Sequence, residues 1–347
     1  MGDGSITPRL GNMKALLGIV AGAGASYGIY KLMSAGSFKR NKKSAPSDSP
    51  AVRSSSPARG GTPQPGSLLA KVSGLDVVCP RPADVASGGI IHQSPGNLEP
   101  QHLKMLLSCL DNSSDPSDRC RILLTLGNAA AFTVNQNLIR EFEGIRIIAG
   151  FLSDPEAEVR VQTLNALNNL CMNIPNQDQL KVYVPQVLEL IEMSPVNSDL
   201  QLSALRLLTN LSVTDKHQHL LKESITLLLS LLVVSTETLQ VQALKVLVNL
   251  SSNPDMMDDI VQAQAPASVV LLFDARTAPA VLVRLLTFAG NLKAWRPSAQ
   301  VADELRRKQD CLFRVMLDES SQLHSKLVQL LSHPDGEIQA QVIRVLT

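Results

Sequence analysis

A short segment of leucines around one asparagine returns at nearly constant spacing through the C-terminal part of the chain. Its clearest copy is residues 205–212, LRLLTNLS, and four further asparagines stand in related surroundings. Aligned on the asparagine, successive copies are 41, 41, 39 and 42 residues apart. A period of about 40 residues is typical of solenoids made of helical repeats. The aligned positions are Asn128, Asn169, Asn210, Asn249 and Asn291.

The repeat around residues 205–212 predicts its own helices. Pro185 opens a first helix, residues 194–198 form a turn, and Asp199 caps a second helix with leucines at three-residue steps. Residues 215–223 supply a short third helix. One short and two longer helices in about 40 residues is the armadillo pattern, whereas TPR and ankyrin units have shorter periods. We therefore predict an all-α fold, a right-handed superhelical armadillo solenoid of about six repeats.

Composition agrees with a helical interior and argues against several other classes. Aromatic residues make up only 3% of the chain, as expected where helices pack through Leu, Val, Ile and Ala. The 5 cysteines form no C-x-x-C pair, so neither a zinc site nor a disulfide framework is indicated, and reduced thiols facing the cytosol are expected. Residues 1–96 hold 11 Lys and Arg against 4 Asp and Glu, whereas the remainder holds 21 against 27. An acidic repeat region argues against nucleic acid as the direct partner.

An apolar segment near the N-terminus predicts a membrane anchor. Residues 15–30 carry no charge and lie between Lys14 and Lys31. As a helix they span about 24 Å, slightly less than a hydrocarbon core, and we assign residues 13–33 to a single transmembrane signal-anchor helix. The basic residues behind this helix place its C-terminal side in the cytosol. The anchor positions are Leu16, Leu17, Ile19, Val20, Tyr27, Ile29 and Tyr30, and the basic flank is Lys31, Lys39, Arg40, Lys42 and Lys43.

The same segment has other interpretations. Gly-x-x-x-Gly steps at residues 18–22 and 24–28 would let two such helices approach closely as a homodimer. A cleaved secretory signal is disfavoured, because export would expose Asn210 and Asn249 as glycosylation acceptors on helices that must pack. A G-x-S-x-G match at residues 24–28 lacks the strand and helix that a nucleophile elbow needs.

Between the anchor and the repeats, the composition turns to Ser, Pro, Gly and Ala. Such a segment cannot bury enough apolar surface to offset its ordering entropy, and a flexible tether is expected. At the other end, the next position of the asparagine pattern after Asn291 falls one residue beyond Thr347, which predicts an insertion near residues 293–323. The predicted order is a short tail at 1–12, the anchor at 13–33, a basic then Ser/Pro-rich linker at 34–96 and the armadillo domain at 97–347.

The chain resembles the Armcx (Alex) family of membrane-anchored armadillo proteins along its whole length. The features that carry the resemblance are a glycine-rich anchor, a basic flank, a Ser/Pro tether and armadillo repeats. The most specific parts are residues 16–30, residues 97–105 and the repeat that begins at Ile145. The resemblance implies insertion into the mitochondrial outer membrane or the endoplasmic reticulum membrane, with the repeats in the cytosol. It also implies a role in mitochondrial distribution through the Miro and kinesin-adaptor machinery and, for one member, effects on cell growth and on p53 activity.

The file of asparagines is the candidate peptide-binding groove. In armadillo proteins the longest helix of each repeat lines a concave groove, where an amide offers an extended peptide both a donor and an acceptor. The alternative is structural, with each asparagine tying the start of the following short helix. Proteins that bind nuclear-localisation peptides place Trp one turn before the asparagine, so an importin-like function is not expected here. Those positions are Leu124, Asn165, Arg206, Lys245 and Thr287.

No residue cluster predicts catalysis, a metal or a cofactor. His217 and His219 are the only near pair of histidines, and we expect both to be solvated rather than metal-bound. The sequence therefore predicts a non-enzymatic, membrane-anchored adaptor that recruits proteins for mitochondrial dynamics, trafficking and cell growth or survival. The alternative is a soluble or nuclear regulator that binds a transcription factor such as p53 and suppresses its activity.

Overall fold

The computed structural model describes residues 99–347. Within this range the chain is helical, apart from one isolated antiparallel bridge between Gln264 and Cys311. The prediction of an all-α fold is confirmed for these residues. The predicted anchor, basic flank and linker lie outside the described residues and stay predictions.

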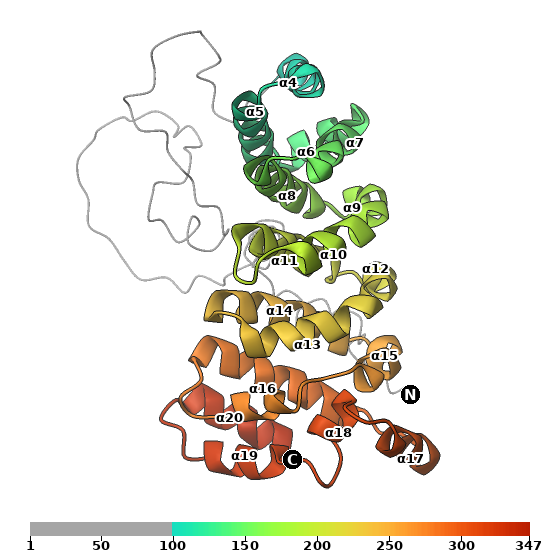
Figure 1. Ribbon diagram of the computed structural model, residues 1–347, viewed down its shortest axis with the longest axis vertical. Helices are drawn as coiled ribbons and strands as arrows, with labels where there is room; N and C mark the ends of the chain where they lie inside the picture. Colours follow the sequence, from blue (N-terminus) through green and yellow to red (C-terminus); the bar gives the residue numbers. More distant parts are fainter. Residues whose placement is uncertain (1–98) are drawn as a thin grey trace, which may run out of the picture. The chain divides into compact units, whose positions relative to one another are not determined.

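The helices follow one another as repeats stacked along one axis (Figure 1). The first repeat has two helices, and the next three have a short, a middle and a long helix in that order. The first two repeats are α4 (Pro100–Asn112), α5 (Pro116–Ala129), α6 (Thr133–Glu141), α7 (Gly144–Ala149) with η3 (Gly150–Ser153), and α8 (Ala157–Cys171). The following two are α9 (Ile174–Leu180), η4 (Lys181–Tyr183) with α10 (Val184–Met193), α11 (Asp199–Leu211), α12 (Asp215–Gln218) with η5 (His219–Ser224), α13 (Ile225–Val234) and α14 (Glu237–Ser251).

The C-terminal helices depart from this pattern. They are η6 (Pro254–Met256), α15 (Met257–Gln262), η7 (Ala267–Leu272), α16 (Pro279–Ala294), α17 (Ala299–Arg307), α18 (Leu312–Met316), α19 (Leu323–Leu330) and α20 (Gly336–Leu346). The middle helix of the fifth repeat is only a 3₁₀ segment, and α17 and α18 lie within the predicted insertion. The chain between them pairs with the residues after α15, because Ala265 N–H donates to Asp310 O at 2.8 Å and Leu312 N–H donates to Ala263 O at 2.9 Å.

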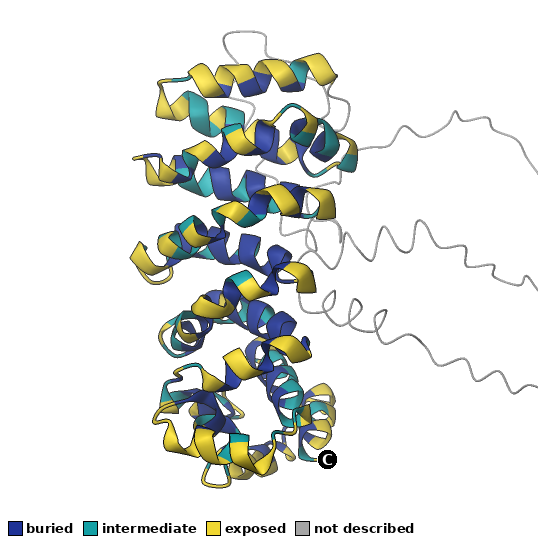
Figure 2. Cartoon of the chain, turned by 90° about the vertical axis from the view of Figure 1, so that its right-hand side faces the viewer, coloured by how far each residue is buried: buried dark blue, intermediate teal, exposed yellow. Residues whose placement is uncertain are grey.

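The long helix of each repeat packs against the long helix of the next. Figure 1 shows α5, α8, α11, α14 and α16 succeeding one another along the stack, with the short helices α9, α12 and α15 along the other side. Leucines at three-residue steps supply the buried face: Leu205 and Leu208 on α11 are both 0% exposed. Figure 2 shows the buried residues running through the interior of the stack. Burying each such side chain stabilises the fold by about 2 kcal/mol, which makes this face the main source of repeat packing.

Capping chemistry sets the helix starts, with one correction. Pro185 lies in the first turn of α10, as predicted. The N-cap of α11 is Ser198 rather than Asp199, because the extended backbone of Ser198 lets its hydroxyl accept from Gln201 N–H at 3.2 Å. Asp199 is instead the first helical residue, where its charge still favours the helix N-terminus. Both residue types cap helices well, so only the backbone geometry distinguishes them.

Candidate peptide-binding surface

The five predicted asparagines occupy the same position near the C-terminal ends of α5, α8, α11, α14 and α16. Their exposure is not uniform. Asn128 is exposed and Asn169 is half-buried, whereas Asn210 and Asn249 retain only 7% and 1% of their accessible surface. Asn291 is again half-buried. The structure therefore places the asparagines in one file, with its middle members largely enclosed by neighbouring repeats.

The amide groups of this file join each repeat to the preceding one. Asn169 Nδ2 donates to Gly127 O at 2.9 Å, and Asn210 Nδ2 donates to Asn168 O at 3.2 Å. Asn249 Nδ2 reaches the equivalent carbonyl, Thr209 O, at 3.4 Å. In each case the acceptor is the residue directly before the previous asparagine. The bonds thus run backward to the preceding long helix, and not forward to the following short helix as the structural alternative supposed.

A second ladder, which sequence reasoning missed, is formed by glutamines on the short helices. Gln136, Gln177 and Gln218 are 2%, 4% and 1% exposed. Gln177 Nε2 donates to Cys171 O of the preceding repeat at 3.0 Å and to Asn210 O of its own repeat at 3.4 Å. Its Oε1 accepts the Thr214 hydroxyl at 2.7 Å.

The other two glutamines repeat this geometry. Gln136 Nε2 reaches Ala130 O at 2.8 Å and Asn169 O at 3.0 Å. Gln218 Nε2 reaches Ser212 O at 2.7 Å and Asn249 O at 3.2 Å. The signal that would have revealed this ladder is the constant spacing of the three glutamines. Each follows an asparagine of the file by eight residues.

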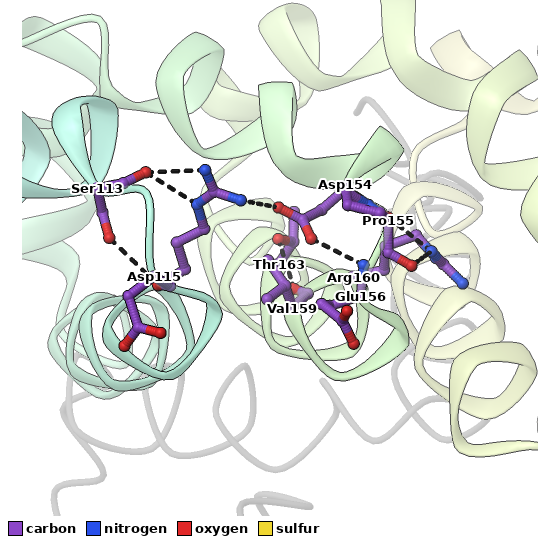
Figure 3. Close-up of polar contacts among 9 residues, drawn as sticks. Ser113, Asp115, Asp154, Pro155, Glu156, Val159, Arg160 and Thr163 are labelled. Atoms are coloured by element: carbon purple, nitrogen blue, oxygen red, sulfur yellow. Dashed lines mark hydrogen bonds and ion pairs between the residues drawn. The ribbon is translucent and has the colours of Figure 1, made fainter.

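A buried ion pair adds to the contact between the first two repeats (Figure 3). Arg119 Nη1 donates to Asp154 Oδ2 at 2.8 Å, and the Asp154 side chain is only 3% exposed. The remaining guanidinium nitrogens Nε and Nη2 donate to Ser113 O at 3.0 and 2.8 Å. Asp154 Oδ1 also accepts from Glu156 N–H at 2.9 Å. The pair is satisfied on both sides, which is the condition for a buried charge to be tolerated.

The two neighbouring histidines differ from the expectation. His219 is exposed as predicted, but His217 is 3% exposed, so its predicted solvation is wrong. Its Nε2 lies 3.6 Å from Asp178 Oδ1. Burial lowers the pKa of His217 and outweighs the opposing effect of Asp178. The reason for the error is local: His217 precedes Gln218 on the inward side of α12, and the hydrophobic pattern of so short a helix is not readable from sequence.

The residues one turn before the asparagines lie on the same face of the long helices. Leu124 is 40% exposed, and the other four, Asn165, Arg206, Lys245 and Thr287, are half-buried. Unlike the asparagines at the centre of the file, Asn165 and Arg206 make no side-chain hydrogen bond within residues 99–347. This face therefore offers polar and cationic side chains that the fold itself does not use.

Other kinds of site find no support in the part of the chain that the structure describes. No group of three His, Cys, Asp or Glu residues between 99 and 347 is placed to hold a metal ion. Across the same residues, no helix has both the length and the apolar character needed to cross a bilayer. The described cysteines, Cys109, Cys120, Cys171 and Cys311, are free thiols.

Comparison with known proteins agrees with the geometry. The armadillo-like family model matches residues 98–317. A designed armadillo repeat protein solved with the peptide (KR)4 superposes with a TM-score of 0.59 at 17% identity, over 70% of this chain and 98% of that one. Computationally designed armadillo repeat proteins for modular peptide recognition give the same values, and an engineered protein gives a TM-score of 0.59 at 19% identity over 71% and 95% of the two chains. Armadillo repeats typically serve as non-enzymatic scaffolds for protein binding. The chain belongs to the armadillo-like repeat family.

Proposed function

We propose that this chain is a non-enzymatic adaptor whose repeats bind an extended segment of a partner protein along the long helices. The observation that carries the proposal is the continuous file of α5, α8, α11, α14 and α16, on which the half-buried side chains of Asn165 and Arg206 make no hydrogen bond within residues 99–347. Two designed armadillo proteins of similar fold bind or are built to bind peptides. In the proposed complex, the exposed amide of Asn128 and the half-buried amide of Asn169 contact the peptide directly, and the enclosed members Asn210 and Asn249 hold the repeats in register.

Membrane anchoring is the second element of the proposal. The uncharged segment within residues 13–33 and the basic flank after it support a single-pass anchor with the repeats in the cytosol. We place the protein at the mitochondrial outer membrane or the endoplasmic reticulum, where it would recruit partners such as the Miro and kinesin-adaptor machinery. The Gly-x-x-x-Gly steps of the anchor would allow a homodimer in the membrane.

The anchor is tested by moving residues 1–43 onto a fluorescent reporter. A membrane-bound reporter supports the proposal, and a diffuse one contradicts it. Carbonate extraction of the full chain separates the adaptor from the alternative, a soluble or nuclear regulator of a transcription factor such as p53. An integral anchor stays in the membrane pellet, whereas a soluble regulator is released.

The binding face is tested with the double variant Asn128→Ala and Asn165→Ala in the full chain. Neither side chain makes a hydrogen bond within residues 99–347, so folding should be unchanged. The matched control is Gln329→Ala, which removes an exposed amide from α19. Affinity purification with the anchor intact should lose partners in the double variant and retain them in the control. Equal recovery from both variants would contradict binding along the long helices.

A further inference from the structure

Three basic residues lie on successive long helices of the stack. Arg206 is on α11, Lys245 on α14 and Arg284 on α16, and all three are half-buried. Arg206 and Lys245 occupy the same position, one helical turn before the asparagine of their own repeat. Arg284 lies two turns before Asn291 on the same face of α16. The three side chains therefore form a cationic row across adjacent repeats.

Within residues 99–347, no carboxylate forms an ion pair with this row. The ion pairs among residues 99–347 involve other residues, and none joins these three to a carboxylate. Lys245 Nζ donates only to Gln242 Oε1, at 3.3 Å, and Arg284 Nη1 donates to Ala280 O at 2.6 Å. Arg284 Nε is buried and has no hydrogen-bond partner among residues 99–347. A buried donor without a partner costs roughly 1–3 kcal/mol, so the fold does not gain from this arrangement by itself.

The three charges also act on one another. The pKa of Lys245 is lowered to about 8, mainly by burial and in part by repulsion from Arg284 and then Arg206. No Asp or Glu in the part of the chain that the structure describes contributes to this lowering of the Lys245 pKa. This concentration of positive charge stands in a repeat region that holds more Asp and Glu than Lys and Arg. Unpaired, partly desolvated cations of one sign are more typical of a binding site than of a packing contact.

We infer that Arg206, Lys245 and Arg284 bind an extended protein segment that carries Asp or Glu side chains. The inference rests on the proposed function, because it takes the long helices as the peptide-binding face and names the chemistry of the peptide. Packed helices lie about 8–10 Å apart, and an extended chain advances about 3.3 Å per residue. Carboxylates two or three residues apart in the segment therefore reach successive cations of the row.

The designed relative solved with (KR)4 binds a peptide of the opposite charge. The fold is the same in outline, so the preference for charge must come from the side chains on the long helices. In this chain that face presents cations in the third, fourth and fifth repeats. A basic segment would be repelled by the row, which makes charge the discriminating property of the partner.

The test uses the full chain in detergent and an acetylated peptide of alternating Glu and Ser residues, with a Gln and Ser peptide as the uncharged control. Fluorescence anisotropy should show binding of the Glu peptide that weakens with salt, and no binding of the control. Lys245→Met should weaken binding roughly fivefold, as expected for one partly exposed charge pair. Arg206→Gln should do the same, and it remains decisive if Lys245→Met fails to fold. Arg146→Gln, which removes an exposed cation from α7, should leave affinity unchanged.

A pH series separates binding from a structural role. Affinity of the unmodified chain should fall as pH rises through about 8, where Lys245 loses its proton, while Arg206 and Arg284 stay charged. The Lys245→Met variant should lose this dependence.

Equal binding of both peptides, or an equal loss of affinity in Arg146→Gln, would overturn the inference. Competition for the site by an oligonucleotide with the same number of negative charges as the Glu peptide would also overturn it. If the Asn128→Ala and Asn165→Ala variant loses partners while the Glu peptide does not bind, the adaptor proposal stands and only the acidic specificity fails.

Discussion

The middle repeats and the fifth repeat bury the same kind of leucine face but join to their neighbours differently. In the middle repeats, Gln136, Gln177 and Gln218 each donate both to a carbonyl at the end of the preceding repeat's long helix and to the long helix of their own repeat. In the fifth repeat the equivalent position, eight residues after the file asparagine, is Met257, which is 3% exposed. An apolar residue thus fills a site where the other repeats place a bonded amide.

The fifth repeat is held in another way. Asn291 Nδ2 donates to Ser251 Oγ at 3.0 Å instead of to a backbone carbonyl. The segment between α17 and α18 binds the backbone after α15, through Asp310 O and Leu312 N–H. Repeats can therefore stack through apolar packing without an amide ladder. Amide ladders add directional bonds that fix how far one repeat is rotated and shifted against the next, and a returning segment substitutes for them where they are absent.

The largest expected effect is loss of that returning segment. Leu312→Ala removes a side chain that is 0% exposed and should cost about 3 kcal/mol of local stability. Because repeat arrays unfold regionally, hydrogen exchange at Ala265 and Leu312 should accelerate while the amides of α8 and α11 stay protected. If hydrogen exchange accelerated uniformly along residues 99–347, the returning segment would not stabilise the fifth repeat separately from the others.

The next largest loss of stability is expected when a ladder glutamine is replaced by methionine, the residue at the equivalent position of the fifth repeat. Gln177→Met keeps most of the volume but leaves Asn210 O, Cys171 O and the Thr214 hydroxyl without their partner. We expect a loss of about 2 kcal/mol in urea unfolding. Gln162→Met, at a half-buried position of α8, is the control and should change stability by less than about 0.5 kcal/mol. Equal effects of the two substitutions would contradict a special role for the ladder.

The ion pair between the first two repeats should contribute slightly less. Asp154→Ala leaves Arg119 buried without its carboxylate and removes the acceptor for Glu156 N–H. The cost should be about 1–2 kcal/mol, because the Arg119 side chain retains 21% exposure and its bonds to Ser113. Arg121→Ala breaks an exposed pair with Asp118 and should have little effect. Thermal unfolding of the two variants measures the difference.

The smallest effect concerns Lys245 and has the opposite sign. Its pKa is lowered from the ordinary lysine value of 10.5 to about 8 in the folded chain, so the unfolded chain holds more protons between those pH values. Stability should therefore rise with pH across that window. Lys245→Met should stabilise the chain at pH 7 by on the order of 1 kcal/mol and abolish the rise. A variant that keeps the same pH dependence would show that another group titrates there.

The sequence by itself determined the period, the helical class and the residues of the buried face. These follow from local chemistry, because leucine spacing, Pro185 in a first turn and the recurring asparagines are all readable along one helix. The same local reading missed the glutamine ladder, although its constant spacing was present, since nothing in one repeat shows which amide faces its neighbour.

Only the tertiary structure decided what the polar residues do. The backward bonds of Asn169 and Asn210, the burial of His217 and the meeting of Lys245 with Arg206 and Arg284 each depend on residues about 40 positions apart. Hydrogen bonds act over about 3 Å and charge repulsion over about 10 Å, and stacking brings such residues within those ranges. The sequence thus fixes which faces are apolar, and the geometry of stacking fixes which polar groups are satisfied and which remain for a partner.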